Sequence, residues 1–170
     1  MLFDFSTWKV TAKAYAKFES AEDVSGTATL TEFQKDTQTL VHVLIDVKGD
    51  PKVLTPGLHG CHIHETGTCE IPYSSAKGHF DPGPSGNPDP DINHPYHSGD
   101  LPNIEVNQEG VGHLETVTNR ITLSPGPLTI FDEDGASLIL HSRKDHCEPA
   151  ESKSGHSGGP RLACAVIQKA

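Results

Sequence analysis

Apolar and polar residues alternate along much of this chain, in stretches rich in Val, Ile and Thr. Successive side chains of a strand point to opposite faces, so this alternation predicts half-buried β-strands. No stretch of useful length has the periodicity of an amphipathic helix. We expect about eight strands between turn signals, at residues 11–18, 24–33, 40–47, 58–64, 104–107, 111–118, 137–141 and 162–167.

Composition agrees with short strands joined by loops. The chain has 16 Gly and 13 Pro but only 6% aromatic residues, a mixture typical of turn-rich folds. Gly110 and Gly135 end two expected turns, where a positive φ costs glycine little. A length of 170 residues suits one domain with one core. The sequence therefore predicts a single all-β domain.

Two long stretches, residues 65–100 and 142–160, have no periodic pattern. The first is rich in proline, and the second is polar and rich in glycine. Unstructured loops of this length in a compact domain are usually functional. Residues with chemical roles are therefore expected in or beside them.

Six histidines and one aspartate lie in or beside these stretches in an order that can build two metal sites. Four imidazoles suit a tetragonal Cu(II) ion, and three imidazoles with a carboxylate suit tetrahedral zinc. Seven ligands can fill two such sites only if one histidine serves both. The candidates are His62, His64, His79, His94, His97, Asp100 and His141.

Spacing supports this interpretation. His62 and His64 are two apart in an expected strand, so both project from one face. His94, His97 and Asp100 form a His-x-x-His-x-x-Asp segment compact enough to wrap an ion. Either motif alone is more often incidental or a solvated turn, so only their joint occurrence indicates metal sites. Metal coordination would replace the missing backbone ladder in the first loop and offset its ordering entropy.

Charge and hydropathy exclude several partners. The formal net charge of -10 argues against binding nucleic acid or an anionic membrane. No run approaches the roughly 18 apolar residues of a membrane span. The first six residues have neither a basic region nor a sustained apolar segment, so we expect no signal peptide there. The compartment stays open between the cytoplasm and an exported location.

Other polar residues have structural interpretations. His59 is expected to make a hydrogen bond to the backbone, and Cys61 is expected to be a small buried hydrophobe. Cys147 has no role that the sequence suggests. Four further histidines are expected at the surface or in loops, and these are His42, His113, His146 and His156.

Four segments carry a family resemblance: GLHGCHIHE at 57–65, GHFDP at 78–82, HSGDL at 97–101 and GGPRLACAVI at 158–167. Together they resemble the copper-zinc superoxide dismutases, over about residues 11 to 168. The resemblance implies an all-β, eight-stranded Greek-key flattened barrel or sandwich with two long functional loops. These are a metal-binding loop (65–100) and an electrostatic loop (142–160). Residues 1–10 would form an N-terminal extension and residues 11–170 the domain.

The resemblance also implies roles for single residues. Copper would be held by His62, His64, His79 and His141. Zinc would be held by His79, His94, His97 and Asp100, with the His79 imidazolate bridging the metals. Arg161 would dock the superoxide anion, Asp145 would link ligand histidines of the two sites, and Cys69 and Cys164 would form a disulfide.

One ligand departs from the family pattern. His94 lies only three residues before His97, whereas the middle zinc histidine usually lies near the centre of the loop. Asn87 and Asp89 lie nearer that place but are poorer zinc ligands than imidazole.

The implied activity is dismutation of superoxide to oxygen and hydrogen peroxide by a redox-cycling copper, with His79 and Arg161 as catalytic residues. The main alternative is a copper- and zinc-binding or delivery protein of the same fold, but such relatives generally lack the full copper set and the arginine. A purely structural sandwich would leave the seven clustered ligands without a purpose. A mononuclear zinc hydrolase would need a nucleophile and base that do not appear. A homodimer and a copper chaperone are further expected partners.

Overall fold

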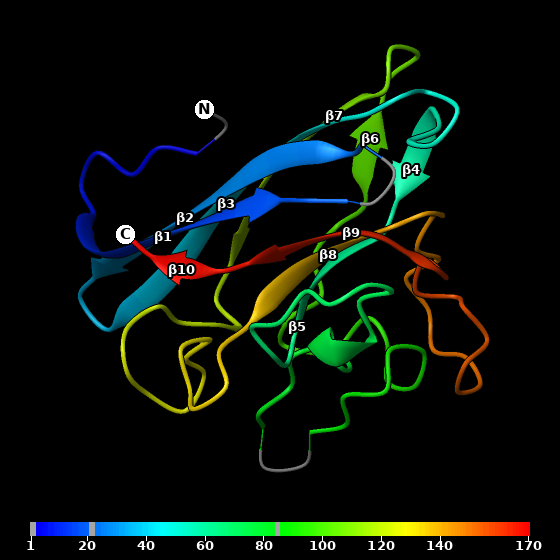
Figure 1. Cartoon of the computed structure of the whole chain (residues 1–170). Coiled ribbons are helices and arrows are strands. Elements are labelled where there is room, and N and C mark those ends of the chain that lie inside the picture. Colours follow the sequence, from blue (N-terminus) through cyan, green and yellow to red (C-terminus); the bar gives the residue numbers. More distant parts are fainter. Residues whose placement is uncertain (1–2, 21–22, 84–85) are drawn as a thin grey trace.

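The computed structural model describes residues 3–20, 23–83 and 86–170. Two antiparallel β-sheets and long loops make up the molecule, and no α-helix occurs among the described residues (Figure 1). A 3-10 turn, η1, spans Ser74–Ala76. The strands are β1 Lys9–Phe18, β2 Ser25–Lys35, β3 Gln38–Lys48, β4 Gly57–His59, β5 Cys61–His64, β6 Ile104–Val106, β7 Val111–Thr118, β8 Ser137–His141, β9 Arg161–Val166 and β10 Gln168–Lys169.

The larger sheet has the order β10-β1-β2-β3-β7-β6-β4, and the smaller sheet has the order β5-β8-β9. β3 pairs with β7 rather than with β4, so the chain after β3 must pass the places of β7 and β6 before it enters β4. β4, β6 and β7 then lie in series and return to β3, which is a Greek-key connection. The all-β Greek-key sandwich is confirmed, with its sheets not closed into a complete barrel.

The prediction of one continuous strand over residues 58–64 was wrong. It is broken at Gly60, where the chain leaves the larger sheet, in which β4 pairs with β6, and enters the smaller one, in which β5 pairs with β8. A Cβ atom at Gly60 would lie 2.8 Å from the carbonyl oxygen of Ser157 and 3.2 Å from the Cβ of Asp145. The electrostatic loop therefore packs directly on the backbone at this switch, which requires glycine there.

The core lies between the two sheets, where the inward residues of each strand meet. In β3, Val43, Ile45 and Val47 are buried at every second position, as the alternation predicts. Leu138 and Leu140 of β8 are fully buried opposite them in the same apolar cluster. Each such side chain contributes about 1.5–3 kcal/mol on burial. This core makes the sheets a rigid support for the loops.

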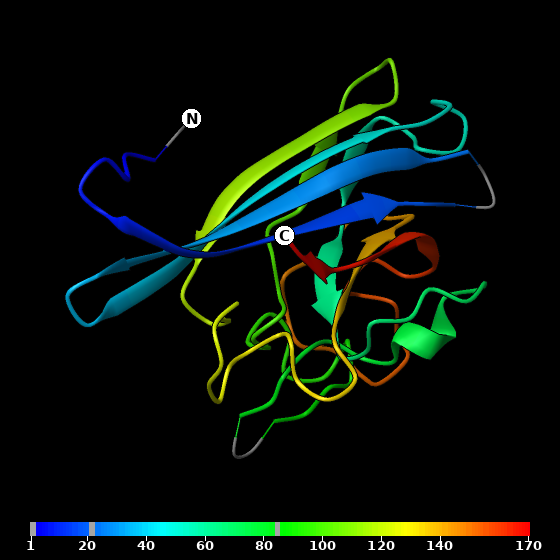
Figure 2. The same cartoon turned by 60° about the vertical axis from the view of Figure 1, so that its left-hand side comes forward.

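The segment before β1 packs on the larger sheet and changes the surroundings of one histidine. The Phe5 ring stacks on Phe33 with centroids 4.1 Å apart and lies 5.7 Å from the ring of His42. Figure 2 shows this segment, in dark blue, leading into β1 of the larger sheet. His42 is only 8% exposed, and its Nε2 lies 2.9 Å from a carboxylate oxygen of Glu115. The expectation that His42 lies at the surface was therefore wrong.

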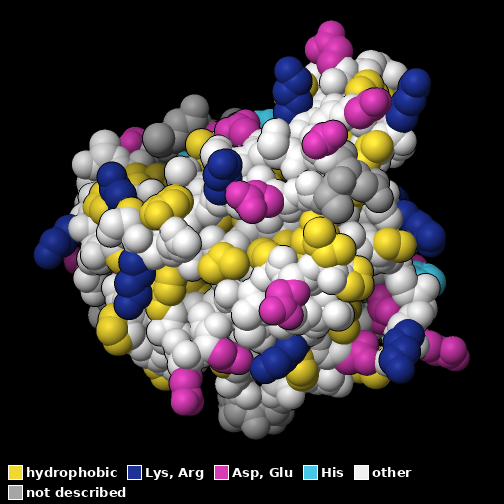
Figure 3. All heavy atoms as spheres, in the orientation of Figure 1, with side chains coloured by type: hydrophobic (Ala, Val, Ile, Leu, Met, Phe, Trp, Pro, Cys, Tyr) yellow, Lys and Arg dark blue, Asp and Glu magenta, His cyan; other side chains and the backbone are white. Residues whose placement is uncertain are grey.

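The expected boundary after residue 10 stays a prediction. β1 begins at Lys9, inside the expected extension, and Met1 and Leu2 lie outside the described residues. On the face drawn in Figure 3, basic and acidic side chains are interspersed with apolar ones. None of the helical structure in the described chain is long and apolar enough to cross a membrane.

A buried carboxylate fastens the connection between β7 and β8 to the larger sheet. Glu32 of β2 is 1% exposed and accepts hydrogen bonds from the backbone N–H groups of Leu123 (2.6 Å) and Ser124 (3.0 Å). The hydroxyls of Ser124 and Thr11 also donate to it. Burial raises the pKa of Glu32, but these donors outweigh that effect and lower it. The charge is therefore held by hydrogen bonds.

Glu32→Ala should lower the free energy of unfolding by about 3 kcal/mol, because it leaves buried donors without an acceptor. Chemical denaturation of the variant and the wild type measures this. Glu109→Gln, on an exposed turn, is the control and should change stability by less than about 0.5 kcal/mol. A loss at Glu32 no larger than at the control would contradict the structural role.

Candidate metal centre

The outer edge of β5 is paired with the metal-binding loop. The N–H of Ile63 donates to the carbonyl of Gly99 (2.9 Å), and the carbonyl of Ile63 accepts from the N–H of Phe80 (2.9 Å). Two isolated β-bridges follow from this pairing, His62 with Asp100 and His64 with His79. Part of the loop therefore has its own backbone ladder, and metal coordination adds to that ladder instead of replacing it.

Four imidazoles converge beside β5 in what we call the first histidine cluster: His62, His64, His79 and His141. One nitrogen of each lies within 4.8 Å of the others, and all four residues are buried. These nitrogens, His62 Nδ1 and the Nε2 atoms of the other three, have no hydrogen-bond partner. Buried polar atoms are normally paired, so four open nitrogens facing one point mark a cation site.

The second nitrogen of each ring is held in place. His64 Nδ1 lies 3.1 Å from the carbonyl oxygen of Lys77, and His141 Nδ1 lies 2.9 Å from that of Gly159. A carbonyl can only accept, so each Nδ1 carries the proton and Nε2 keeps its lone pair. His62 Nε2 lies 2.9 Å from the carboxylate of Asp145, which leaves Nδ1 open. Every ring is thus oriented as a ligand.

A second cluster surrounds the Asp100 carboxylate. Its oxygens lie 2.7 Å from His79 Nδ1, 2.8 Å from His97 Nδ1 and 3.2 Å from His94 Nδ1. His79 therefore faces the first cluster with Nε2 and the second with Nδ1. The ligand atoms that converge within 4.8 Å on this side belong to His62, His79, His94 and Asp100, and His97 joins them through Asp100. We call His79, His94, His97 and Asp100 the second cluster.

Asp145 links the two clusters through one histidine of each. One of its carboxylate oxygens lies 2.9 Å from His62 Nε2, and the other lies 2.7 Å from His94 Nε2. The structure therefore brings His94 to the centre despite its late position in the loop. Asp89, which lies nearer the usual place, instead contacts the hydroxyl of Ser152. Asn87 binds Asp81 through its backbone N–H.

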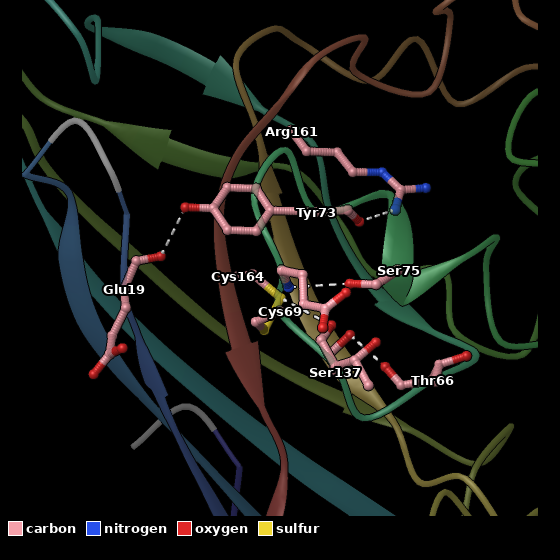
Figure 4. The surroundings of a disulfide bond; sticks show 10 residues. Glu19, Thr66, Cys69, Tyr73, Ser75, Ser137, Arg161 and Cys164 are labelled. Carbon is pink, nitrogen blue, oxygen red and sulfur yellow. Dashed lines mark hydrogen bonds between the residues drawn. A yellow bond between two sulfur atoms is a disulfide. The ribbon is translucent and has the colours of Figure 1, made fainter.

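Arg161 lies at the start of β9, beside the first histidine cluster. Its guanidinium donates to the carbonyl oxygen of Tyr73 (Figure 4) and also to that of Lys77, on the other side of η1. The disulfide between Cys69 and Cys164 ties the same segment to β9, as expected, with the Cα atoms 5.6 Å apart. The Lys77 carbonyl therefore serves both Arg161 and His64. The sequence did not reveal this role, because a backbone acceptor has no residue-type signal.

Residues 24–167 match the family model described as copper/zinc superoxide dismutase. The chain belongs to this family. It is similar to the Superoxide dismutase [Cu-Zn] of Deinococcus radiodurans, with 38% identity over 156 residues that cover 85% of this chain and 78% of the relative. Superoxide dismutase [Cu-Zn] 2 of Aquifex aeolicus is 33% identical over 92% of this chain and 86% of its own length. Superoxide dismutase [Cu-Zn] 1 of Salmonella typhimurium strain LT2 is 36% identical over 68% of this chain and 66% of its own length.

Copper and zinc, the metals of this family, need deprotonated ligands. In the first cluster, burial keeps the imidazoles deprotonated. Burial lowers the pKa of His62 and of His79 to about 4 and that of His141 to about 3. It also takes the pKa of His64 well below its usual value. These rings are therefore neutral at physiological pH.

The second cluster differs, because its carboxylates favour protonated imidazole. Burial lowers the pKa of His94, but hydrogen bonds to Asp100 and Asp145 outweigh it and raise the value to about 9. The pKa of His97 is raised in the same way by Asp100. A cation that binds here therefore displaces protons from the imidazoles of His94 and His97.

His59 and Cys61 have the structural roles that the sequence suggested. His59 is 1% exposed, with Nδ1 2.9 Å from the carbonyl of His141 and Nε2 2.7 Å from that of Thr55. Cys61 is fully buried, and burial raises the pKa of its thiol to about 12. Neither side chain is available as a ligand.

A cavity of about 500 Å³ gives access to the first cluster. His141 and Arg161 line it together with Arg143 and Lys153 of the electrostatic loop. Three cationic side chains thus surround the approach to the histidines. Asp89 and Asp91 line the cavity as well, so three cations and two carboxylates leave a small net positive charge there, although the whole chain carries -10.

The metal-free protein should be most stable near pH 6.5. Below that value the unfolded chain binds more protons than the first cluster does, so stability falls with decreasing pH until about pH 3–4. Above it the folded state holds the proton of His94 more tightly, so stability falls as pH rises toward 9. Unfolding in denaturant with a chelator present, at a series of pH values, measures both limbs.

Two variants separate the limbs of this pH profile. His141→Gln should flatten the acidic limb by about 1.4 kcal/mol per pH unit, the value for one proton, and leave the alkaline limb unchanged. His94→Gln should do the reverse. A stability that rises or falls steadily from pH 4 to 9, or variants that affect the same limb, would contradict the opposite pKa directions.

Proposed function

We propose that this chain dismutates superoxide with copper in the first histidine cluster and zinc in the second cluster. The observation that carries this assignment is the set of four buried imidazole nitrogens that face one point without a hydrogen-bond partner. Four imidazoles suit Cu(II), and three imidazoles with Asp100 suit zinc. Family membership supplies the activity. Because His79 belongs to both clusters, it would bridge the two metals.

Copper supplies a one-electron redox step that oxidises one superoxide ion and reduces the next, whereas zinc has no such step. The balanced reaction consumes two superoxide ions and two protons and yields one oxygen and one hydrogen peroxide. The chain must therefore deliver protons. His79 Nε2 faces the first cluster without a partner, so this atom can hold a proton and pass it to reduced superoxide.

Arg161 is proposed to dock the anion. Its guanidinium is fixed by the carbonyls of Tyr73 and Lys77, so its charge has a defined place beside His141 in the cavity. Asp145 is proposed to orient His62 and His94, since its two oxygens contact one nitrogen of each. These residues position the substrate and the ligands without taking part in electron transfer.

A binding or delivery role without catalysis is less well supported. Such a protein would not need Arg161, whose contacts place a cation at the entrance to the cluster. A homodimer and a copper chaperone as partner stay predictions. The face that holds the disulfide loop and β10 exposes Ile71 (68%) and Tyr15 (46%), which favours an interface there.

Metal content and superoxide dismutation, measured on the same samples, test the assignment. His141→Ala should lose copper and at least 99% of the activity while keeping zinc, because this ring faces only the first cluster. Asp100→Ala should lose zinc first and lower the melting temperature by about 5 °C or more, because the loop loses its ligand.

The control for these variants is His113→Ala, since the side chain of His113 is exposed and, among the described residues, pairs with Asp46 alone. It should keep both metals and full activity. Full activity of His141→Ala at full copper loading would contradict the site assignment. An inactive wild type with both metals bound would contradict the function itself.

Steering by local charge gives a further test. At 0.15 M salt the screening length is about 8 Å, so remote acidic residues have little influence on the substrate. Arg161→Glu should lower kcat/KM at least tenfold, whereas Lys35→Glu, on the far end of β2, should change it less than twofold. The wild-type rate should fall as salt is added. A rate that rises steadily with ionic strength would show that repulsion by the whole molecule dominates.

A further inference from the structure

We propose that Asp91 is a positioning residue that clasps the electrostatic loop and thereby fixes the imidazole of His141. The effect of Asp91 on catalysis rests on the proposed function, whereas its effect on the electrostatic loop does not. Asp91 lies in the metal-binding loop and is not needed as a ligand, since the second cluster is complete without it. It is nevertheless buried, with 4% of its surface exposed.

All three oxygens of Asp91 hold the electrostatic loop. The carboxylate oxygens accept hydrogen bonds from the backbone N–H groups of Gly155 (3.0 Å) and Ser157 (3.0 Å). Its carbonyl oxygen accepts from the N–H of Ala150 (2.8 Å). A buried carboxylate is costly unless it is hydrogen-bonded, so these donors account for the presence of a charge here. One residue therefore fixes the loop at three points.

The turn that Asp91 holds contacts His141 directly. The carbonyl of Gly159 accepts the Nδ1–H of His141 (2.9 Å), and the carbonyl of Gly158 accepts the N–H of Arg143 (3.1 Å). Gly158 has φ of 119°, and a Cβ atom there would lie 2.7 Å from the Cβ of His141. If the turn at 155–159 moved, His141 would lose the acceptor that selects its tautomer. The open Nε2 would then no longer be assured.

The same turn forms part of the cavity wall. Lys153, Gly155, Ser157 and Gly159 line the cavity with His141. A second link between the loops, from the Ser152 hydroxyl to Asp89, is exposed and so competes with water. We therefore assign the clasp to Asp91 and not to the Asp89 contact.

Electrostatics and positioning predict opposite effects on activity when the charge of Asp91 is removed. Asp91 is an acidic residue on the wall of a cavity that must admit an anion. By electrostatics alone, its neutralisation should leave superoxide dismutation unchanged or raise it. Positioning predicts the opposite sign, because Gly155 and Ser157 donate to different carboxylate oxygens and in Asn one of these atoms becomes an NH2 group, which cannot accept.

The test is Asp91→Asn in the full-length chain, examined first without metals. Amide exchange of Gly155 and Ser157 should become at least tenfold faster, while amides of β2 and β3 keep their protection. Nitrogen-15 spectra of His141 should change from one tautomer with protonated Nδ1 to a mixture of two. Trypsin should cleave after Lys153 at least fivefold faster.

With both metals bound, Asp91→Asn should lower kcat/KM at least fivefold and alter the copper electron paramagnetic resonance spectrum. Ser152→Ala removes the exposed link, and Glu109→Gln removes one negative charge from a remote turn. Both controls should stay within twofold of the wild type in every measurement.

Unchanged exchange at Gly155 and Ser157, or an unchanged His141 tautomer, would overturn the proposal. So would a loss of protection in β2 and β3 equal to that in the loop, because it would show a general effect on folding. An inactive wild type would disprove the proposed function alone, since the metal-free measurements would still decide the role of Asp91.

Discussion

Backbone pairing along the outer edge of β5 is the constraint on which the metal centre depends. Ile63 uses its N–H and its carbonyl to bind Gly99 and Phe80, two parts of the loop that are 19 residues apart in sequence (99 − 80). Because this pairing sets the register, Asp100 comes opposite His62 and His79 opposite His64. Backbone pairing thus brings together side chains that lie far apart in the loop at 65–100. The loop pays only part of its ordering entropy through coordination.

The two clusters use opposite electrostatics, although they share His79. In the first, burial keeps the imidazoles neutral, so their lone pairs are available at the pH at which the protein works. In the second, Asp100 and Asp145 raise the pKa of His94, so a proton occupies the place of a cation. The carboxylates that stabilise the protonated ring also supply the negative charge that a divalent zinc ion requires.

Much of this arrangement could be predicted from the sequence, and the exceptions have physical causes. Alternation predicted the strands, and spacing predicted the residues that form the two clusters, because both signals belong to side chains. The switch between sheets at Gly60 was missed because the alternation continues through it, and the reason for glycine lies in Ser157, far along the chain. His42 was misjudged because residues outside its own strand bury it. The carbonyls of Lys77 and Gly159, which hold His64 and His141, could not be predicted because every residue has a carbonyl.

The two walls of the cavity are held by different kinds of bond, one by a disulfide and the other by hydrogen bonds. The disulfide between Cys69 and Cys164 closes a separation of 95 residues, which constrains the unfolded chain by about 4–5 kcal/mol in the chain-entropy model. It holds the segment whose carbonyls fix Arg161, so the place of this cation is set by covalent structure and not by metal binding. The opposite wall has no such covalent link, and the turn next to Lys153 is held by hydrogen bonds that Gly155 and Ser157 donate to Asp91 of the metal-binding loop. Loss of zinc would therefore disturb the electrostatic loop while Arg161 kept its place. Docking of the anion and shaping of the channel are separable properties of this fold.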